Sequence, residues 1–89
     1  MDKVILDGRF MKNKKLVHLY IKFQLESREY IGSNLDALWD VLSTYSQPIR
    51  ISLYNKDILI ENLGDYGQSL IKVFEDAAEE NSNIEFEII

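Results

Sequence analysis

Three short segments of this chain alternate apolar and polar residues, and this alternation limits the fold more than any other part of the sequence. The segments are Lys3–Asp7, Ile49–Tyr54 and Ile84–Ile88, and β-branched or aromatic residues are frequent in each. Helical patterns separate them, so we expect right-handed crossovers and parallel strands. The second and third segments are apolar on one face only, which argues for helices on that face alone. The sequence therefore predicts an α/β fold with two layers: a three-stranded parallel sheet with helices packed on one face. The opposite face should expose Arg50, Ser52, Glu85 and Glu87 to solvent.

The first two helices are predicted from their caps and from apolar spacing. Asn13 can cap the first, and either Ser33 or Asn34 can cap the second. Apolar residues at i, i+3, i+4 and i+7 indicate that the second helix packs along one side. The residues expected to face inward are Leu16, Leu19, Tyr20 and Phe23 in the first helix, and Leu35, Leu38, Trp39 and Leu42 in the second.

Two further helices are expected after the second strand. A short helix fits Asn55–Asn62, with Gly64 as its C-cap. A longer one should run from Gly67 to about Glu80. Its inward residues are expected to be Leu70, Val73, Phe74 and Ala77.

Length and charge limit the class of protein. The 89 residues suit one domain over residues 1–89, and the net charge is −5. Residues 1–28 hold seven basic and three acidic residues, whereas residues 29–89 hold three basic and twelve acidic ones. Such a field repels nucleic acid and attracts a basic partner. The absence of cysteine, together with an N-terminus unlike a secretory signal, favours the cytoplasm. The apolar runs are too short to cross a bilayer, so no membrane partner is expected.

Candidate catalytic and metal-binding residues are scarce. His18 is the only histidine, and alone it cannot form a metal site or a triad, so we expect a solvated or half-buried helix residue. The glycines are too scattered for a phosphate-binding loop. Asp36 and Asp40 could serve as acid and base only in an enclosed pocket, which nothing in the sequence indicates. We therefore expect no enzyme activity, no cofactor and no metal.

One face of the second predicted helix is acidic. Asp36, Asp40 and Thr44 share it, and like charges at i and i+4 slightly destabilise a helix. Asp36 could simply complement the helix N-terminus, with Asp40 an incidental charge. The neighbouring Trp39 and the preceding turn Tyr30–Gly32 favour a binding surface instead, because aromatic groups add contact area. A second acidic group on the last helix could join this surface or be a solvated face: Glu75, Asp76, Glu79 and Glu80.

The string EYIGSNLDALWD, from Glu29 to Asp40, resembles the signature of the barstar family. These proteins are small intracellular inhibitors of secreted bacterial ribonucleases such as barnase. The resemblance extends over the whole chain and implies a three-stranded parallel sheet with helices on one side. It also implies that the loop and second helix enter the active site of a nuclease, where carboxylates occupy the position of substrate phosphate.

The resemblance assigns roles residue by residue. Tyr30 would pack on the catalytic machinery, Asp40 would be the central carboxylate, and Asp36 the second. Asp76 matches a contacting acidic residue of the last helix but is one methylene shorter, so its reach is reduced. The implied partner-binding residues are Tyr30, Ile31, Gly32, Asn34, Leu35, Asp36, Trp39, Asp40, Thr44, Tyr45 and Asp76.

Some positions depart from the family pattern. Ile31 replaces a second loop aromatic, and Thr44, Tyr45 and Gln47 stand where the family's rim has a glycine, a tryptophan and an acidic residue. These changes indicate a different cognate nuclease. The family has a cis proline at the turn before the second strand, so the Gln47–Pro48 bond is expected to be cis.

Two functions stay open at this point. The first is a cytoplasmic ribonuclease inhibitor, monomeric when free, that blocks the active site of a basic extracellular barnase-like enzyme. The second is an acidic interaction module of the same fold with a basic partner that is not a nuclease. Neither requires nucleic acid or a membrane. Ribonuclease activity measured alongside binding would separate the two.

Overall fold

A three-stranded parallel sheet in the order β1-β2-β3 forms the upper layer of the protein. The computed structural model describes residues 2–25 and 34–89. β1 spans Asp2–Asp7, β2 spans Ile49–Tyr54 and β3 spans Ile84–Ile88. In the register, Ile51 of β2 lies between Val4 of β1 and Phe86 of β3. The predicted α/β sheet, including its parallel direction, is confirmed.

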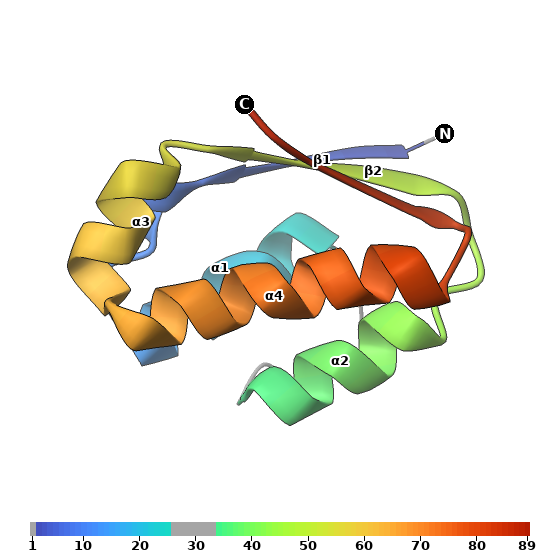
Figure 1. Cartoon of the computed structure of the whole chain (residues 1–89), viewed down its shortest axis with the longest axis horizontal. Helices are drawn as coiled ribbons and strands as arrows, with labels where there is room; N and C mark the ends of the chain where they lie inside the picture. Colours follow the sequence, from blue (N-terminus) through green and yellow to red (C-terminus); the bar gives the residue numbers. More distant parts are fainter. Residues whose placement is uncertain (1, 26–33) are drawn as a thin grey trace.

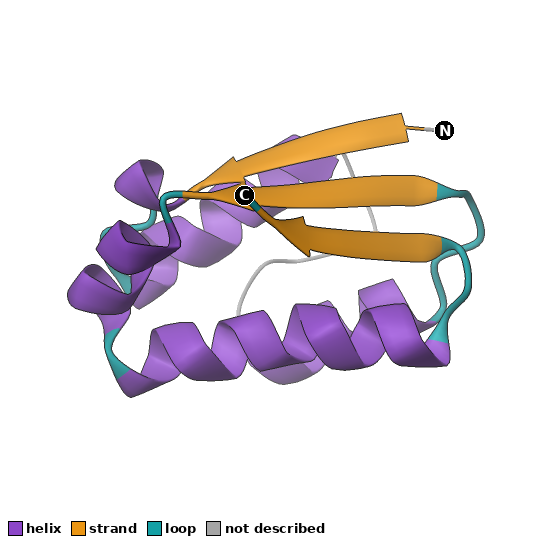
Figure 2. Ribbon diagram, turned by 45° about the horizontal axis from the view of Figure 1, so that its top comes forward, coloured by secondary structure: helices purple, strands orange, loops and turns teal. Residues whose placement is uncertain are grey.

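The helices of the described residues lie on one side of the sheet or at its end (Figures 1 and 2). α1 packs against β1, and α4 runs beneath β3. α2 packs chiefly against α4, and α3 lies beyond the strand ends, beside a short 3-10 turn, η1. The bounds are Gly8–Phe10 for η1, Lys14–Leu25 for α1, Leu35–Ser43 for α2, Lys56–Leu63 for α3 and Asp65–Glu80 for α4.

The two faces of the sheet differ as the alternation predicts. The inward residues of the strands, such as Ile51 and Leu53, join a continuous apolar core with the helices. On the other face Glu85 and Glu87 are exposed and Arg50 is half-buried. The Arg50 Nε donates to Glu85 Oε2 at 2.9 Å and lies 3.9 Å from Glu87 Oε2. The polar, uncovered face is therefore confirmed, and its charges are paired across the strands.

The inward face predicted for α1 is wrong. Leu16, Leu19 and Phe23 are exposed, and only Tyr20 of the predicted set is half-buried. The face that packs on the sheet instead carries Val17, His18, Ile21 and Leu25. Apolar residues occur on almost every side of this helix, so periodicity alone does not fix its rotation.

Two polar contacts set the rotation of α1. The Tyr20 hydroxyl accepts a hydrogen bond from the Asp7 backbone N–H at 3.0 Å, which ties α1 to β1. His18, expected to be solvated or half-buried, is only 1% exposed. Its Nε2 shares a 2.5 Å hydrogen bond with the hydroxyl of Tyr66 on α4. A buried imidazole with a hydrogen-bond partner costs little, which is why His18 can face the core.

The turn between α3 and α4 depends on Gly64, whose φ is +57° and ψ is −129°. Side chains disfavour this backbone region, so a glycine ends α3 here and lets α4 begin at once at Asp65. The predicted C-cap is confirmed, and α4 starts two residues earlier than expected from Gly67. Leu70, Phe74 and Ala77 are buried as predicted, and Val73 is half-buried.

The expected cis bond before Pro48 is wrong. The described residues, which include Gln47 and Pro48, contain no cis peptide bond. The trans form of an X–Pro bond is preferred by about 0.5–1 kcal/mol unless the surroundings select against it. Here Pro48 is exposed and its carbonyl accepts from the Asp2 N–H at 3.3 Å.

Candidate functional site

α2 is held in place at its N-terminus by Asn34. The Asn34 side-chain oxygen accepts from the Ala37 N–H at 2.8 Å, and its carbonyl accepts from the Leu38 N–H at 3.2 Å. This satisfies donors that the first helical turn would otherwise leave free. Asp36 lies in the same turn, where a negative charge complements the helix dipole. The open choice of cap is thus settled for Asn34.

The inner face of α2 anchors it to the core. Leu38 and Leu42 are fully buried, and Leu35 and Trp39 are half-buried against the core residues. These four are the residues predicted to face inward. The indole of Trp39 therefore lies where the buried and exposed faces of the helix meet. A side chain at such a border can contribute part of its surface to a partner without unfolding the helix.

The outer face of α2 carries Asp36 and Asp40, both exposed. They are one turn apart, and no described basic residue lies within ion-pair distance of either. Such a like-charged pair costs an isolated helix about 0.2–0.5 kcal/mol. Two neighbouring carboxylates on a rigid helix therefore present concentrated negative charge to solvent or to a basic partner.

Residues after α4 brace the C-terminal end of α2. The Asn81 side-chain amide donates to the carbonyls of Leu42 at 3.0 Å and Tyr45 at 2.9 Å. Asn83 adds a bond to the Tyr45 carbonyl at 3.1 Å. Carbonyls at a helix end lack intrahelical donors, so these contacts both satisfy them and fix α2 relative to α4. The sequence analysis missed this brace, although asparagine at the C-cap of α4 was a usable signal.

Thr44 and Tyr45 lie at the C-terminal end of α2. The Thr44 hydroxyl donates to the Asp40 carbonyl at 2.7 Å, and the Thr44 side chain is exposed. Tyr45 is half-buried against the core. The two residues expected at the rim thus lie beside the acidic face, with the Thr44 hydroxyl engaged with the backbone.

Asp76 lies on α4, the helix that packs against α2. Its carboxylate is 3.6 Å from the Lys72 ammonium, one turn earlier on the same helix. Lys72 therefore offsets part of the charge of Asp76, in contrast to Asp36 and Asp40. The neighbouring Glu75, Glu79 and Glu80 are exposed. Tyr30, Ile31 and Gly32, the other predicted contact residues, lie outside the described part of the chain.

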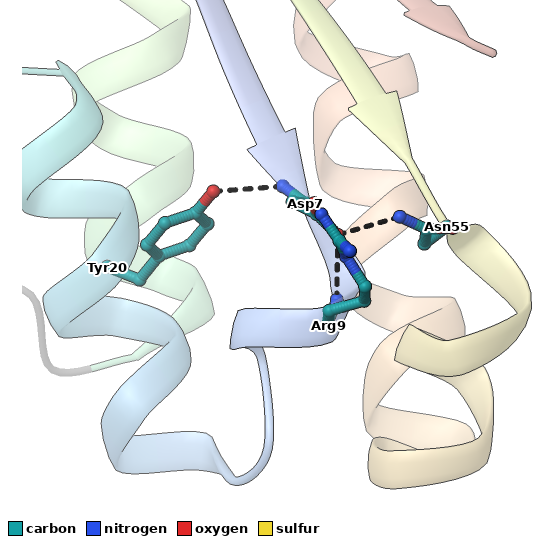
Figure 3. Close-up of polar contacts among 4 residues, drawn as sticks. All are labelled: Asp7, Arg9, Tyr20 and Asn55. Carbon is teal, nitrogen blue, oxygen red and sulfur yellow. Dashed lines mark hydrogen bonds and ion pairs between the residues drawn. The ribbon is translucent and has the colours of Figure 1, made fainter.

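A second polar cluster, also missed from the sequence, joins the ends of β1 and β2 (Figure 3). The Asp7 carboxylate accepts from the backbone N–H, Nε and Nη2 of Arg9 and from Nδ2 of Asn55, at 2.7–3.2 Å. The Arg9 side chain, followed by the Arg9 and Asn55 N–H groups, holds the pKa of Asp7 well below its usual range despite burial. Both oxygens of the Asp7 carboxylate accept hydrogen bonds, so we interpret the cluster as a structural link between β1, η1 and α3.

Close packing accompanies this link. A Cβ on Gly8 would lie 2.2 Å from the Asn55 carbonyl oxygen, so only glycine fits between β1 and the start of α3. Asn55 itself has a left-handed φ of 57°, which asparagine tolerates better than most residues. Both residues thus support the close packing of β1 on the start of α3.

Other kinds of site find no support in the described residues. Among them, no three His, Asp or Glu side chains are placed to hold one metal ion. Within the same ranges, no helix is both long and apolar enough to span a membrane. The exposed carboxylates of α2, Asp36 and Asp40, remain the candidate site.

Comparison with known proteins agrees with this geometry. Residues 1–89 match the family model described as Barstar (barnase inhibitor). The chain is also 38% identical over 90 residues to a protein of Bacillus subtilis (strain 168) named "Putative ribonuclease inhibitor YrdF", covering 100% of this chain and 98% of the relative. A match of this extent shows common ancestry and fold, and the chain belongs to the barstar family of barnase inhibitors.

Proposed function

We propose that this protein inhibits a barnase-like ribonuclease by inserting the acidic face of α2, together with the loop before it, into the active site of the enzyme. The observation that carries the proposal is the pair of exposed carboxylates, Asp36 and Asp40, which have no described cation beside them. Family membership supports a nuclease as the partner. The cysteine-free composition supports an encounter in the cytoplasm, before the enzyme is exported.

The chemistry of ribonuclease active sites suits such a surface. An enzyme that cleaves RNA must bind phosphates with basic side chains, so neighbouring exposed carboxylates are complementary to it in charge. Binding would exclude the substrate without any bond being made or broken. The cap at Asn34 and the brace at Asn81 hold α2 before binding, which lowers the entropy lost on association.

The proposal gives Asp40 the largest role. Asp40→Asn keeps the size of the side chain and removes its charge, leaving basic groups of the partner desolvated and unpaired. Loss of one partner from a buried charge pair costs about 2–5 kcal/mol, so the inhibition constant should rise by about 30-fold or more. Inhibition of a purified barnase-like enzyme measures this directly. Glu61→Gln, an exposed acidic residue of α3, is the matched control and should change inhibition little.

Melting temperatures separate this role from a structural one. Asp40 makes no described ion pair, so Asp40→Asn should melt at the wild-type temperature or slightly above it. Equal inhibition by wild type and Asp40→Asn would contradict the proposal. Tight binding of a basic protein with no effect on RNA cleavage would instead favour the interaction module.

A further inference from the structure

The outward side of α1 carries an apolar ridge, formed by Leu16, Leu19 and Phe23. These side chains are 42%, 49% and 80% exposed, and their spacing of three and four residues aligns them along the helix. Phe10, 58% exposed, packs beside the same helix through Tyr20, with ring centroids 5.8 Å apart. Single exposed apolar residues are common on protein surfaces. Three aligned along one helix form a contiguous apolar patch, which indicates a binding surface.

Rotation of the helix cannot bury this ridge. The opposite side of α1 already fills the core with Val17, Ile21 and Leu25. The Tyr20 hydroxyl is bonded to β1, and His18 is bonded to Tyr66 of α4. Turning α1 to cover Phe23 would break both bonds and expose the buried residues. The ridge is therefore a permanent part of the surface.

The charged residues within α1 are all of one sign. α1 contains no acidic residue, and its charged side chains are Lys14, Lys15 and Lys22, all exposed. Among the described residues, no carboxylate lies within ion-pair distance of Lys15 or Lys22. The acidic helices α2 and α4 pack on each other, whereas α1 packs chiefly against β1 and η1 and meets α4 at Tyr66, near the start of that helix. The basic and acidic surfaces are thus carried by separate parts of the fold.

This charge pattern limits what can cover the ridge. A symmetric contact between two copies would bring the lysines of both α1 helices together, which opposes dimerisation. A protein partner would have to supply an acidic groove shaped for a convex helix. An anionic bilayer supplies negative charge at its surface and an apolar layer just below, with no need for a matched shape.

We propose that α1 docks this protein on anionic phospholipid surfaces, with Leu19 and Phe23 entering the interface and Lys15 and Lys22 contacting headgroups. This replaces the expectation, drawn from the sequence, that no membrane takes part. That expectation rested on apolar runs too short to cross a bilayer, which does not address a helix that docks on the bilayer surface. The docked protein would keep α2 available, because the ridge and the acidic face lie on different helices. The inference is independent of the proposed inhibition.

Flotation with lipid vesicles tests the proposal. Wild type should float with vesicles of phosphatidylcholine and phosphatidylglycerol, and much less with pure phosphatidylcholine. Phe23→Ser should lower the partition coefficient at least tenfold, because a buried phenyl ring is lost. Lys15→Gln with Lys22→Gln should lower it about 25-fold, at roughly fivefold for each charge. Ile58→Ser and Lys56→Gln, matched exposed residues of α3, should change nothing.

Three results would overturn the proposal. The first is wild type that fails to float with anionic vesicles. The second is Phe23→Ser floating as well as wild type. The third is a ridge-dependent dimer in sedimentation velocity, or ridge-dependent retention on immobilised poly-glutamate, without vesicle binding, since either assigns the ridge to a protein partner. Ribonuclease inhibition by the same variants should equal that of wild type, so this test and that of the proposed function can fail separately.

Discussion

At the scale of single residues, His18 shows how an imidazole can serve as part of a core. It is almost fully buried, and burial lowers its pKa from the ordinary value of 6.5. Tyr66 of α4 shares a hydrogen bond with it, and the Lys14 ammonium lies 4.7 Å from the centre of the Tyr66 ring. The neutral imidazole is therefore the form that the fold accommodates.

Lowering the pH should show how far stability depends on a neutral His18. Because the pKa of His18 is lower in the folded chain, the unfolded chain takes up a proton first as pH falls. The contribution of His18 to stability is thus complete above pH 6.5 and is lost as pH falls from there through the folded pKa. Between about pH 7.5 and about pH 5, wild type should lose more melting temperature than His18→Gln, which cannot titrate. Equal losses of melting temperature in the two proteins would show that protonation of His18 does not destabilise the fold.

At the scale of elements, the sequence predicts most of the fold but not the way in which helices are oriented and braced. The strands and α2 have apolar residues on one face only, so their orientation can be predicted from the sequence. In α2, for example, the fully buried residues are Leu38 and Leu42. α1 has apolar residues on two sides, and distant hydroxyl and imidazole contacts choose between them. Contacts between residues far apart in sequence carry no local signal. The acidic face was predictable because Asp36 and Asp40 are one helical turn apart in the sequence. An asparagine at position 81 indicates a helix end, but the sequence does not show that its side chain bonds to the end of α2.

The brace can be tested by Asn81→Ala. This change removes two bonds donated to the end of α2 and one that Asn81 Oδ1 accepts from the Asn83 N–H. Each such bond contributes about 0.5–1.5 kcal/mol, so the free energy of unfolding should fall by about 1.5–4.5 kcal/mol in urea titrations. Ribonuclease inhibition should also weaken under conditions where the variant is fully folded, because α2 is then less fixed. Ser82→Ala, an exposed neighbour, is the control. Unchanged stability would show that the brace contributes nothing.

At the scale of the whole molecule, charge separation is the property that the proposed inhibition and the proposed docking share. Basic residues are concentrated before residue 29 and acidic ones after it. In the structure this places lysines on α1 and most exposed carboxylates on α2, α4 and the sheet face. A basic enzyme approaching such a molecule is turned toward the acidic side before contact. The long-range field should therefore act on the rate of association more than on the lifetime of the complex.

Salt and distant charges should reveal this steering. Glu79→Gln with Glu80→Gln removes two exposed charges near the end of α4 and leaves Asp36 and Asp40 intact. We expect the association rate constant with a barnase-like enzyme to fall about two- to fivefold at low ionic strength, with the dissociation rate constant nearly unchanged. The difference from wild type should shrink as salt shortens the Debye length to about 8 Å near physiological ionic strength.

Glu85→Gln is the control, because its charge is paired with Arg50 on the uncovered sheet face. Stopped-flow association measured over a range of salt concentrations provides both rate constants. An association rate that does not depend on salt would contradict steering by these charges. A change confined to the dissociation rate constant would instead place Glu79 and Glu80 in direct contact with the enzyme.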